Sequence, residues 1–512
     1  MRNPAIGRLQ NNQTAFFSVL SHTLMKLPRP TALYFLAPAL LLTHCNVGPD
    51  YKKPNVPTPG KFSGTKEGIY SKANADASIR NWWRRFNDAE LNSLINRAIA
   101  HNQDLRIAAA NVEQARALYR QARLDYFPTV RSQGYYQRTH YSDAQSLGAI
   151  AGATGASKNL QVLDAELDAT WELDFWGRVR RSVRAANADV ATAEANRRDA
   201  LVILTAQLAS AYMQLRGLQM ELGVAQRNAA NQRETLKLTE SLLQGGRGTE
   251  LDTSRARAQL NQTLAAIPSI ESAISKNTHL IGVLTGYTPE SVEKELAATK
   301  PLPDMPSLVR IGDPASLLRR RPDIEAAEES LRAATERIGV ATADLFPRVV
   351  FNGTAGVQAN NFAKFGGPNI GATSFGPNIS WPAFDLGRVK AQIDAAGAKA
   401  KSALASYEKV VNGALQETED ALVDYGRQRA RTGFLREAAS ASEQAAKLAR
   451  ERYQNGVADF LTVLDAERTM LQAQSDLAAS ETVTATAIVA IFRALDGGWD
   501  SSGSEKVGGS GK

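Results

Sequence analysis

The chain repeats one pattern of residues in the same order along its length. Residues 105–128 return as residues 324–347, a shift of 219, and both copies end in Phe-Pro. Trp171 returns as Trp381, a shift of 210. The two shifts differ by 9 residues, so the length changes between these landmarks, in a stretch that we expect to be an exposed loop. A tandem repeat of this size predicts a quasi-symmetric fold in which each copy builds the same part.

Composition excludes several classes of function. The 512 residues include one cysteine and 5 histidines, which excludes a His/Cys metal cluster and a disulfide within one chain. His101, His140 and His279 are scattered without ligand partners and no catalytic constellation is present, so we expect neither an enzyme nor a cofactor. The net charge is +8, but basic and acidic residues alternate along the helical stretches. This alternation indicates solvated helix faces rather than a nucleic-acid surface.

Two long stretches without proline predict very long helices. No proline lies between Pro128 and Pro268 or after residue 382, and both stretches are rich in Ala, Leu, Gln, Glu and Arg. We expect helices over residues 178–244 and 388–454, each of 67 residues and about 100 Å long. A heptad seam in the first helix predicts helix packing, and its members are Leu201, Leu204, Leu208, Ala211, Leu215, Leu218 and Leu222.

Glycine-containing turns end both long helices and start returning helices. Gly246 and Gly456 lie at these turns, where a left-handed backbone is needed. Pro268 is expected to kink or break the first returning helix.

Three arginines at residues 319–321 could suggest phosphate binding. A helix start explains them better, because Pro322 suits a first turn and the acidic residues after it complement the helix dipole.

A second periodicity indicates strands. Residues 163–175 alternate between apolar and polar side chains without exception, which predicts a strand with one apolar and one wet face. Residues 349–359 and 375–383 show related alternation, and residues 129–141 are a weaker candidate. A sheet that packs its apolar face on a soluble core is the alternative to a membrane sheet.

The strands predict a membrane β-barrel that one chain cannot close. Alternating segments of about ten residues are typical of outer-membrane barrels, and lipid tolerates no open sheet edge. We expect a homotrimer, because three copies of a four-stranded sheet supply 12 strands and filled barrels need about eight. The hairpin tips are glycine-rich, near residues 142–158 and 360–373. The acidic residues expected to face the lumen are Asp164, Glu166, Asp168, Glu172 and Asp174.

These elements predict a mixed fold of membrane β-barrel and all-α tunnel. Each protomer is a tandem structural repeat with four strands and long coiled-coil helices, closed as a trimer with a 12-stranded barrel and a helical barrel. In each repeat we expect an entering helix, then a strand hairpin, then a long-helix hairpin. In the first repeat these span residues 91–128, 129–175 and 176–286, in that order. In the second repeat they span residues 313–347, 348–384 and 385–495. An equatorial linker at residues 287–312 joins the repeats, and residues 496–512 form a flexible tail.

The N-terminus predicts export. An apolar run of 12 residues, too short to span a bilayer, indicates a signal peptide over residues 1–44, with Met25 as an alternative start. The lone Cys45 directly after it looks like a bacterial lipoprotein cleavage site at which the cysteine is acylated. His44 departs from the small residue usual before such a cysteine, so ordinary cleavage nearby is the alternative. Residues 45–90 begin with a proline-rich stretch and are expected to form an extended tether.

Several motifs together resemble one known family. The motifs are Val-Gly-Pro-Asp-Tyr-Lys-Lys-Pro at residues 47–54, Leu-Arg-Arg-Arg-Pro-Asp-Ile at 318–324, Phe-Pro at 346–347, Tyr-Gln-Asn-Gly at 453–456 and Leu-Thr-Val-Leu-Asp-Ala at 461–466. They resemble outer-membrane efflux lipoproteins, the TolC-like outer-membrane factors of the multidrug type, over nearly the whole mature chain. The resemblance implies a trimeric, lipid-anchored outer-membrane channel that extends into the periplasm and docks onto a periplasmic adaptor and an inner-membrane pump.

The resemblance also implies a gate. Side chains that point inward near the second turn close the periplasmic tip in this family, and here they are Leu461 and Asp465. Asp252 and Arg255 are weaker candidates at equivalent depth in the first repeat. Some members lock the tip with an additional Arg and Asp, but this chain has Ala458 and Thr462 at the corresponding places. Coiled-coil packing and a solvated acid are the alternative roles for Leu461 and Asp465. The residues expected at the adaptor-docking tip are Gly245, Gly246, Thr249, Asn455 and Gly456.

The function expected from these features is a passive exit duct for drugs or other small toxic compounds, opened at its tip by the adaptor. The same duct could instead export peptides, metal ions or signalling molecules. A periplasmic coiled-coil scaffold without a pore is the alternative from a different class. The strict alternation at residues 163–175 argues against a scaffold, because a scaffold needs no lipid-facing strand.

Overall fold

The computed structural model describes residues 46–63, 70–71, 81–142, 144–155, 157–306, 309–315 and 320–495. Cys45, the expected signal peptide and the expected C-terminal tail lie outside the described residues. The chain divides into two compact units, and each is described by itself. The strand unit includes residues 124–181 and 339–391, and the helical unit includes residues 50–123, 182–338 and 392–495.

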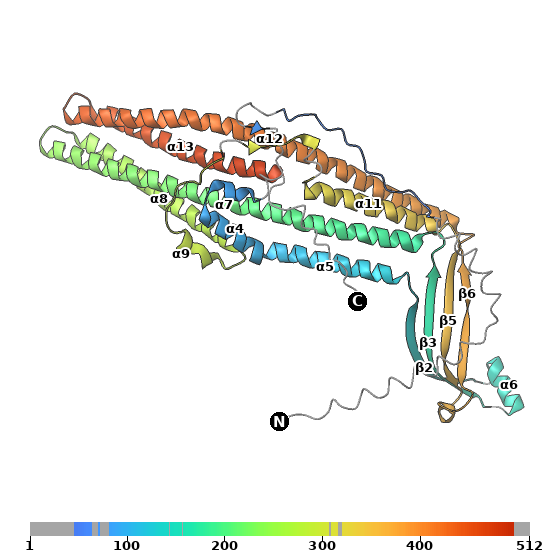
Figure 1. The fold of residues 1–512 in the computed structure, drawn as a ribbon. Helices are drawn as coiled ribbons and strands as arrows, with labels where there is room; N and C mark the ends of the chain where they lie inside the picture. The colour runs from blue at the N-terminus through green and yellow to red at the C-terminus, as the bar shows by residue number, and fades with distance from the viewer. Residues whose placement is uncertain are drawn as a thin grey trace, which may run out of the picture. The chain divides into compact units, whose positions relative to one another are not determined.

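The strand unit holds one antiparallel sheet of four strands (Figure 1). The strands, in the spatial order β2-β3-β5-β6, are Thr129–His140, Asn159–Leu173, Arg348–Ala359 and Gly371–Ser380. All four predicted strands are therefore present. The last strand begins before and ends before the predicted 375–383, because Gly371 pairs with Val357 and the pairing ends where Ser380 meets Arg348.

The register gives the sheet one apolar and one polar face. On the apolar face Trp171 pairs with Phe351, which pairs in turn with Pro377. The side chain of Phe375 on this face is 84% exposed in the protomer. On the polar face Asp168 lies between Arg131 and Thr354 of the neighbouring strands. Because side chains alternate along a strand, the strict period-2 sequence pattern becomes this two-faced sheet.

The two hairpin connections contain short helices. Helix α6, Ser146–Thr154, lies in the first connection, where a glycine-rich tip was expected. Its Ser-Leu-Gly-Ala-Ile-Ala-Gly-Ala-Thr sequence contains enough small apolar residues for two turns of helix despite its glycines. The second connection holds the 3-10 turn η3, Phe362–Lys364, which Asn361 caps by accepting the Lys364 backbone N–H at 3.0 Å.

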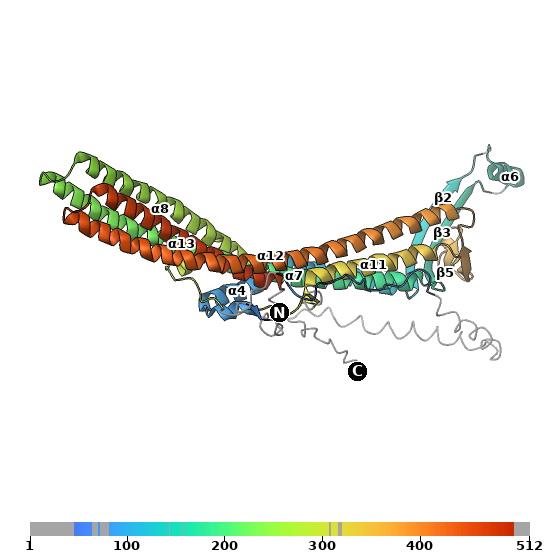
Figure 2. The same cartoon turned by 90° about the horizontal axis from the view of Figure 1, so that it is seen from above.

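The helical unit is built from two helical hairpins and two flanking helices (Figures 1 and 2). The first hairpin consists of α7, Arg178–Gln244, and α8, Glu250–Leu284, and the second of α12, Leu386–Gln454, and α13, Phe460–Ala494. The flanking helices α5, Gln103–Leu124, and α11, Pro322–Ala343, run beside the first parts of α7 and α12. Ion pairs fix α7 against both flanking helices, through Arg116–Glu194 at 2.7 Å and Arg337–Asp189 at 2.5 Å.

The long helices match the predicted bounds closely, but the break considered at Pro268 is absent. Helix α7 spans the predicted residues 178–244, and Leu204, Leu208 and Leu215 of its heptad seam are buried. Pro268 does not break the first returning helix, because α8 is continuous from Glu250 to Leu284 with this proline inside it. A proline removes one backbone hydrogen bond, and the packed neighbours of a long helix can outweigh that loss.

The middle of the helical unit carries a buried belt of short elements. These are β1, Tyr70–Ser71; η1, Trp82–Phe86; α4, Ala89–His101; η2, Pro289–Val292; α9, Glu293–Leu296; and β4, Val309–Arg310. Strand β1 pairs in parallel with β4, and the Trp82 ring stacks on Phe492 of α13 with centroids 5.1 Å apart. The expected tether over 45–90 is therefore only partly right. Trp82, Trp83 and Phe86 are fully buried core residues, because burying such aromatic surface is strongly favourable.

Among the described residues, one helix is long and apolar enough to cross a membrane by length and composition. It is α13, with a mean hydropathy of 1.3 over its most apolar window. Half of that window is buried inside the protomer, as is usual for a core helix. The sequence prediction had identified no such segment.

Candidate functional site

The two helical hairpins end in turns of the same conformation. Gly246 and Gly456 each have φ of 73°, in the left-handed region that favours glycine. Around Gly246 the N–H of Arg247 donates to the carbonyl of Leu242 at 2.8 Å, and around Gly456 the N–H of Val457 donates to Arg452 at 2.9 Å. The predicted docking turns are thus equivalent rigid structures in the two repeats.

The helix caps after the turns use the same two residue types in opposite order. At the start of α8, the hydroxyl of Thr249 donates to the carboxylate of Asp252 at 2.7 Å and accepts the Asp252 backbone N–H at 3.2 Å. At the start of α13, the hydroxyl and the backbone N–H of Thr462 donate to Asp459 at 2.6 Å and 2.9 Å. These bonds lower the pKa of Asp459. One carboxylate oxygen of Asp252, a weaker gate candidate, therefore accepts the hydroxyl of Thr249, the residue that caps α8.

The two leading gate candidates lie one turn apart on the same face of α13. The side chain of Leu461 is 54% exposed, and Asp465 is also exposed. Arg255 is half-buried on α8. Within the described part of the protomer, neither Asp465 nor Arg255 has a hydrogen bond or ion pair. The arrangement leaves an apolar and an acidic group free to meet groups outside one protomer.

A buried carboxylate behind the tip was missed by sequence reasoning. Glu467 of α13 is 2% exposed, and its Oε1 accepts from the Thr235 hydroxyl of α7 at 2.7 Å and from Arg450 of α12 at 2.8 Å. A buried charge needs such partners, because leaving it unpaired is costly. The sequence signal was an acid inside an apolar stripe, three residues after Leu464 and three before Met470. Glu467 thus joins three of the long helices.

Apolar packing completes the structure behind the tip. The Tyr453 ring lies 5.6 Å from the Phe460 ring across the second turn. Both belong to a buried cluster that joins α8, α12 and α13 and consists of Ala256, Ala449, Tyr453, Phe460, Val463 and Leu464. Because this cluster holds the buried face of α13, it also orients the exposed face that carries Leu461 and Asp465.

The acidic residues of β3 divide into two groups. Asp164, Glu166 and Asp168 lie on the polar face of the sheet, as the alternation predicts. Their neighbours are neutral amides and one arginine: Gln133 donates to Glu166, Gln358 donates to Asp164 at 3.3 Å, and Arg131 pairs with Asp168 in the register. The polar face of the sheet is therefore net acidic along β3.

The other two acids lie at the end of the strand and fix the start of α7. Glu172 accepts from Arg178 Nε at 2.7 Å. Asp174 accepts the backbone N–H groups of Val179 and Arg180 at 3.1 and 2.9 Å, so its charge lies at the positive end of the helix dipole. Three members of the predicted lumen-facing set thus lie on the polar face of the sheet, whereas these two carboxylates join strand to helix.

A second acidic site, absent from the sequence prediction, lies in the helical unit. It is a hollow of about 710 Å³ among α7, α11, α12 and α13. Its charged lining residues are Asp199, Arg321, Asp323, Glu417, Asp420, Asp424 and Arg493. Burial raises the pKa of Asp199, and the nearby charge of Asp323 raises it further. Arg321 donates to Asp323 and to Glu417, at 2.8 Å each.

An ionic network holds the belt to α7. Arg216 is fully buried and pairs with Glu90 in the first turn of α4. The Tyr212 hydroxyl donates to Asp88, the α4 N-cap, at 2.8 Å, and Lys300 reaches Glu90 at 3.0 Å. The side chains that the sequence left unassigned here therefore serve as structural ties.

The described residues contain no group of three or more His, Cys, Asp or Glu side chains able to hold a metal ion. The expected lipidation residue, Cys45, lies outside them. The residues directly after it belong to the strand unit: the Val47 N–H donates to Trp176 at 3.3 Å, and Gly48 lies so close to Gly339 that a Cβ would be 2.6 Å from its Cα.

Comparison with known proteins gives one consistent result. The family described as Outer membrane efflux protein matches the chain twice, at residues 94–279 and 314–497, which correspond to the two sequence repeats. The solvent efflux pump outer membrane protein SrpC of Pseudomonas putida is 32% identical over 471 residues, covering 90% of this chain and 97% of that protein. Nodulation protein T of Rhizobium leguminosarum biovar trifolii is 31% identical over 456 residues, covering 89% and 94%.

Solved structures give the same result. The outer-membrane channel OprN has a TM-score of 0.82 and 41% identity, covering 89% of this chain and 100% of that one. The outer membrane protein VceC of Vibrio cholerae has a TM-score of 0.74 and 28% identity, covering 82% and 99%.

Proposed function

The chain belongs to the outer membrane efflux protein family, and from this premise we propose that three copies close a channel through the outer membrane. The sheet carries this proposal. Within the described residues β2 and β6 each pair on one side only, so both edges of a lipid-facing sheet are open. Lipid offers no hydrogen bonds to such edges. Pairing β6 of one copy with β2 of the next would close a barrel of 12 strands, three times the four of one protomer.

The two faces of the sheet support a water-filled conduit. The apolar face, with Trp171, Phe351 and Phe375, suits lipid. In the proposed barrel the polar face, with Asp164, Glu166 and Asp168, would line the enclosed space. An acidic lumen attracts cations and disfavours anions.

The tip of α13 supports a gate. Leu461 and Asp465 are exposed and lack partners within the described protomer. Three copies around an axis would bring three apolar and three acidic groups together and narrow the tube. The paired turns at Gly246 and Gly456 are proposed to dock the periplasmic adaptor of an efflux pump, because they end the two hairpins in the same rigid conformation.

The proposed cargo is small toxic compounds, such as solvents or antibiotics. This rests on relatives named as solvent and antibiotic efflux pump outer membrane proteins. Nodulation protein T is related at similar identity, so export of a signalling molecule is the second candidate. Lipid attachment at Cys45 is also proposed, since Val47 and Gly48 lie against residues at the ends of strands and helices of the strand unit.

Planar-bilayer conductance of the purified full-length chain tests the channel. Wild-type protein should conduct weakly, and the Leu461→Ala/Asp465→Ala double variant should conduct more and favour cations less. Thr462→Ala, on the same turn, weakens a helix cap without removing a gate group and is the matched control. Absence of conductance in every variant would favour the scaffold, and equal conductance in wild type and double variant would remove these residues from the gate.

A further inference from the structure

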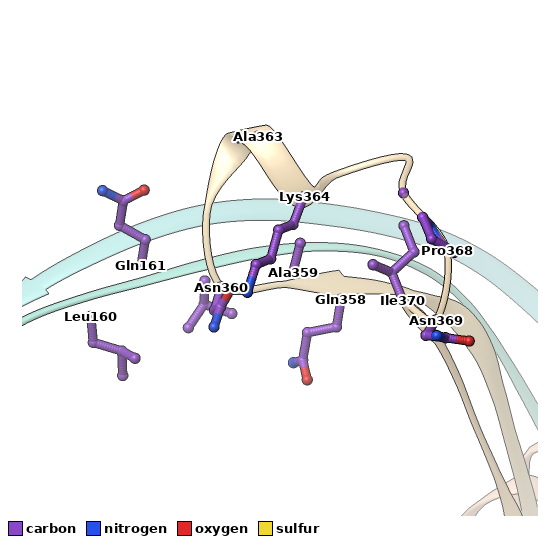
Figure 3. Close-up of a pocket in the computed structure, with 12 residues that line it drawn as sticks. Leu160, Gln161, Gln358, Ala359, Asn360, Ala363, Lys364, Pro368, Asn369 and Ile370 are labelled. Carbon is purple, nitrogen blue, oxygen red and sulfur yellow. The ribbon is translucent and has the colours of Figure 1, made fainter.

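The β5–β6 connection folds back over the apolar face of the sheet. The Phe362 ring of η3 lies 6.0 Å from the ring of Tyr136, which is on the apolar face because it pairs with Leu163. Figure 3 shows η3 on the side of the sheet toward which Gln161 and Ala359 point, whereas Leu160 and Gln358 point to the other side. This connection is therefore placed beside the surface that faces lipid.

The low exposure of two apolar side chains agrees with a connection that covers this end of the apolar face. Leu163 and Ala359 are 5% and 6% exposed, although other apolar side chains of the same face are open. Phe362 and Phe365, which frame η3, remain exposed. The turn is also internally fixed, since the N–H of Gly367 donates to the Lys364 carbonyl at 3.0 Å. The turn thus presents two exposed aromatic rings at the hairpin end of a lipid-facing sheet.

A cavity of about 730 Å³ lies beneath this turn (Figure 3). Lys364 is the only charged residue among the 12 that line it, and none of the 12 is acidic. The remaining lining includes the amides of Gln161, Asn360 and Asn369 and the apolar Ile370, whereas Leu160, Val162 and Gln358 contribute from strands on which their side chains turn to the other face of the sheet. Within the described residues the Lys364 ammonium has no hydrogen bond or ion pair. The cavity therefore combines one free cation with amide donors and apolar walls, which suits an anionic headgroup on a lipid.

We propose that this cavity binds a phosphate group of a glycolipid headgroup in the outer leaflet. The inference rests on the outer-membrane location of the proposed channel. The hairpin connections lie at the strand ends opposite to those that lead into α7 and α12, and thus at the outer surface. Lys364 pairs with the phosphate, while Phe362 and Phe365 lie among the upper acyl chains, where aromatic side chains concentrate in membrane proteins.

Native mass spectrometry of the full-length protein with bisphosphorylated lipid A tests the site. Wild type should retain this lipid in preference to dephosphorylated lipid A. Lys364→Glu should reduce retention about fivefold or more, the effect expected from one cation at an anionic surface. Lys364→Arg should retain it. Lys390→Glu, the same charge change on an exposed residue at the start of α12, is the matched control and should behave as wild type.

Three results would overturn the proposal. One is equal retention by wild type and Lys364→Glu, and another is equal retention of the two lipids by wild type. The third is displacement of lipid A by millimolar inorganic phosphate, which would make the cavity a site for free anions. The wild-type lipid comparison needs no variant, so a misfolded mutant cannot hide the outcome. Conductance of the same samples separates this site from the channel, because a channel that conducts without lipid selectivity refutes only the lipid site.

Discussion

Asn102 and Arg321 occupy equivalent positions in the two repeats and make the same contact with different chemistry. The Asn102 side-chain amide donates to the carbonyl of Leu284 at 3.0 Å, and Arg321 donates to the carbonyl of Ala494 at 2.8 Å. Asn102 and Arg321 are 219 residues apart, and the acceptors Leu284 and Ala494 are 210 residues apart. These two separations are the two shifts of the sequence repeat. Each residue thus ties the start of a flanking helix to the last turn of a returning helix.

Removing either tie should destabilise the protein, and the second more than the first. Asn102 is buried, so Asn102→Ala leaves the Leu284 carbonyl unpaired at a cost of about 1–3 kcal/mol. It also removes the acceptor of the Leu105 N–H in the first turn of α5. Arg321→Ala also strips Asp323 of its ion-pair partner and leaves Glu417 with Arg493 alone, at 3.5 Å. Breaking a fully buried ion pair costs roughly 3–5 kcal/mol. The loss of stability here should be smaller than that, because the side chains of Asp323 and Glu417 are 28% and 34% exposed. Thermal unfolding in detergent measures both, with Arg321→Lys as the charge-conserving control. A larger loss for Asn102→Ala would contradict this order.

Glu467→Ala should loosen α13 from α7 and α12 and raise conductance. The substitution leaves Arg450 without its 2.8 Å partner and removes the hydrogen bond that the Thr235 hydroxyl makes to α13, so that this hydroxyl keeps only the Asn231 carbonyl of its own helix as acceptor. Since α13 also carries Leu461 and Asp465, we expect faster amide exchange along its first turns together with more frequent openings. Thr235→Val removes only one hydrogen bond between helices and keeps the Arg450–Glu467 ion pair, so it should have a smaller effect. Faster exchange without any change in conductance would separate this contact from the gate.

The sequence predicted those elements whose pattern is long and regular. Helix α7 begins and ends at the predicted residues, because its Ala- and Leu-rich stretch lacks proline and ends in Gly245 and Gly246. The two-faced sheet followed from the alternation at residues 163–175. The alternation of apolar and polar residues is weaker in the last strand, β6. Gly371 and its small polar neighbours belong to this strand only because β5 pairs with them.

The remaining features depend on contacts between distant residues. Nothing in the proline-rich tether shows that Trp82 will stack on Phe492, which lies 410 residues later. The roles of Glu467 and Arg216 are set by partners on other helices. Pro268 illustrates the opposite case, in which a strong local signal was overruled by the packing of a long helix.

Gly217→Ala should destabilise the crossing of α7 and α13. A Cβ at Gly217 would lie 1.9 Å from the Thr482 hydroxyl oxygen, so the two helices must move apart. Overpacking of this kind costs about 1–3 kcal/mol. Adding Thr482→Gly should restore part of the lost melting temperature, even though glycine inside a helix costs about 1 kcal/mol by itself.

A matched helix glycine provides the control for this crossing. Gly397→Ala in α12 adds the same methyl where nothing lies within 4 Å. It should hold or raise the melting temperature, because alanine favours the helix. Equal melting temperatures for the two alanine variants would show that α7 and α13 are not held in close contact at Gly217.

Asp199→Asn should stabilise the protein at neutral pH and lose that effect in acid. Burial raises the pKa of Asp199, with Asp323 and Glu417 adding to the rise and Arg321 and Arg493 opposing it. The folded state therefore binds this proton more tightly than the unfolded state, so ionisation of Asp199 subtracts stability as pH rises through its raised pKa. Below the ordinary aspartate pKa of about 4 the carboxyl is neutral in both states and the penalty vanishes.

Melting temperatures of wild type and Asp199→Asn between pH 4 and pH 8 measure this difference. The variant should gain over wild type as pH rises and match it at the acid end. Asp424→Asn removes a carboxylate that lines the same hollow but is exposed, so it should show no comparable pH-dependent gain. A gain for Asp199→Asn that is constant across pH would instead assign the effect to side-chain shape. A gain that grows toward acid would mean that folding lowers the pKa of Asp199 rather than raising it, because only a lowered pKa makes the ionised carboxylate stabilising.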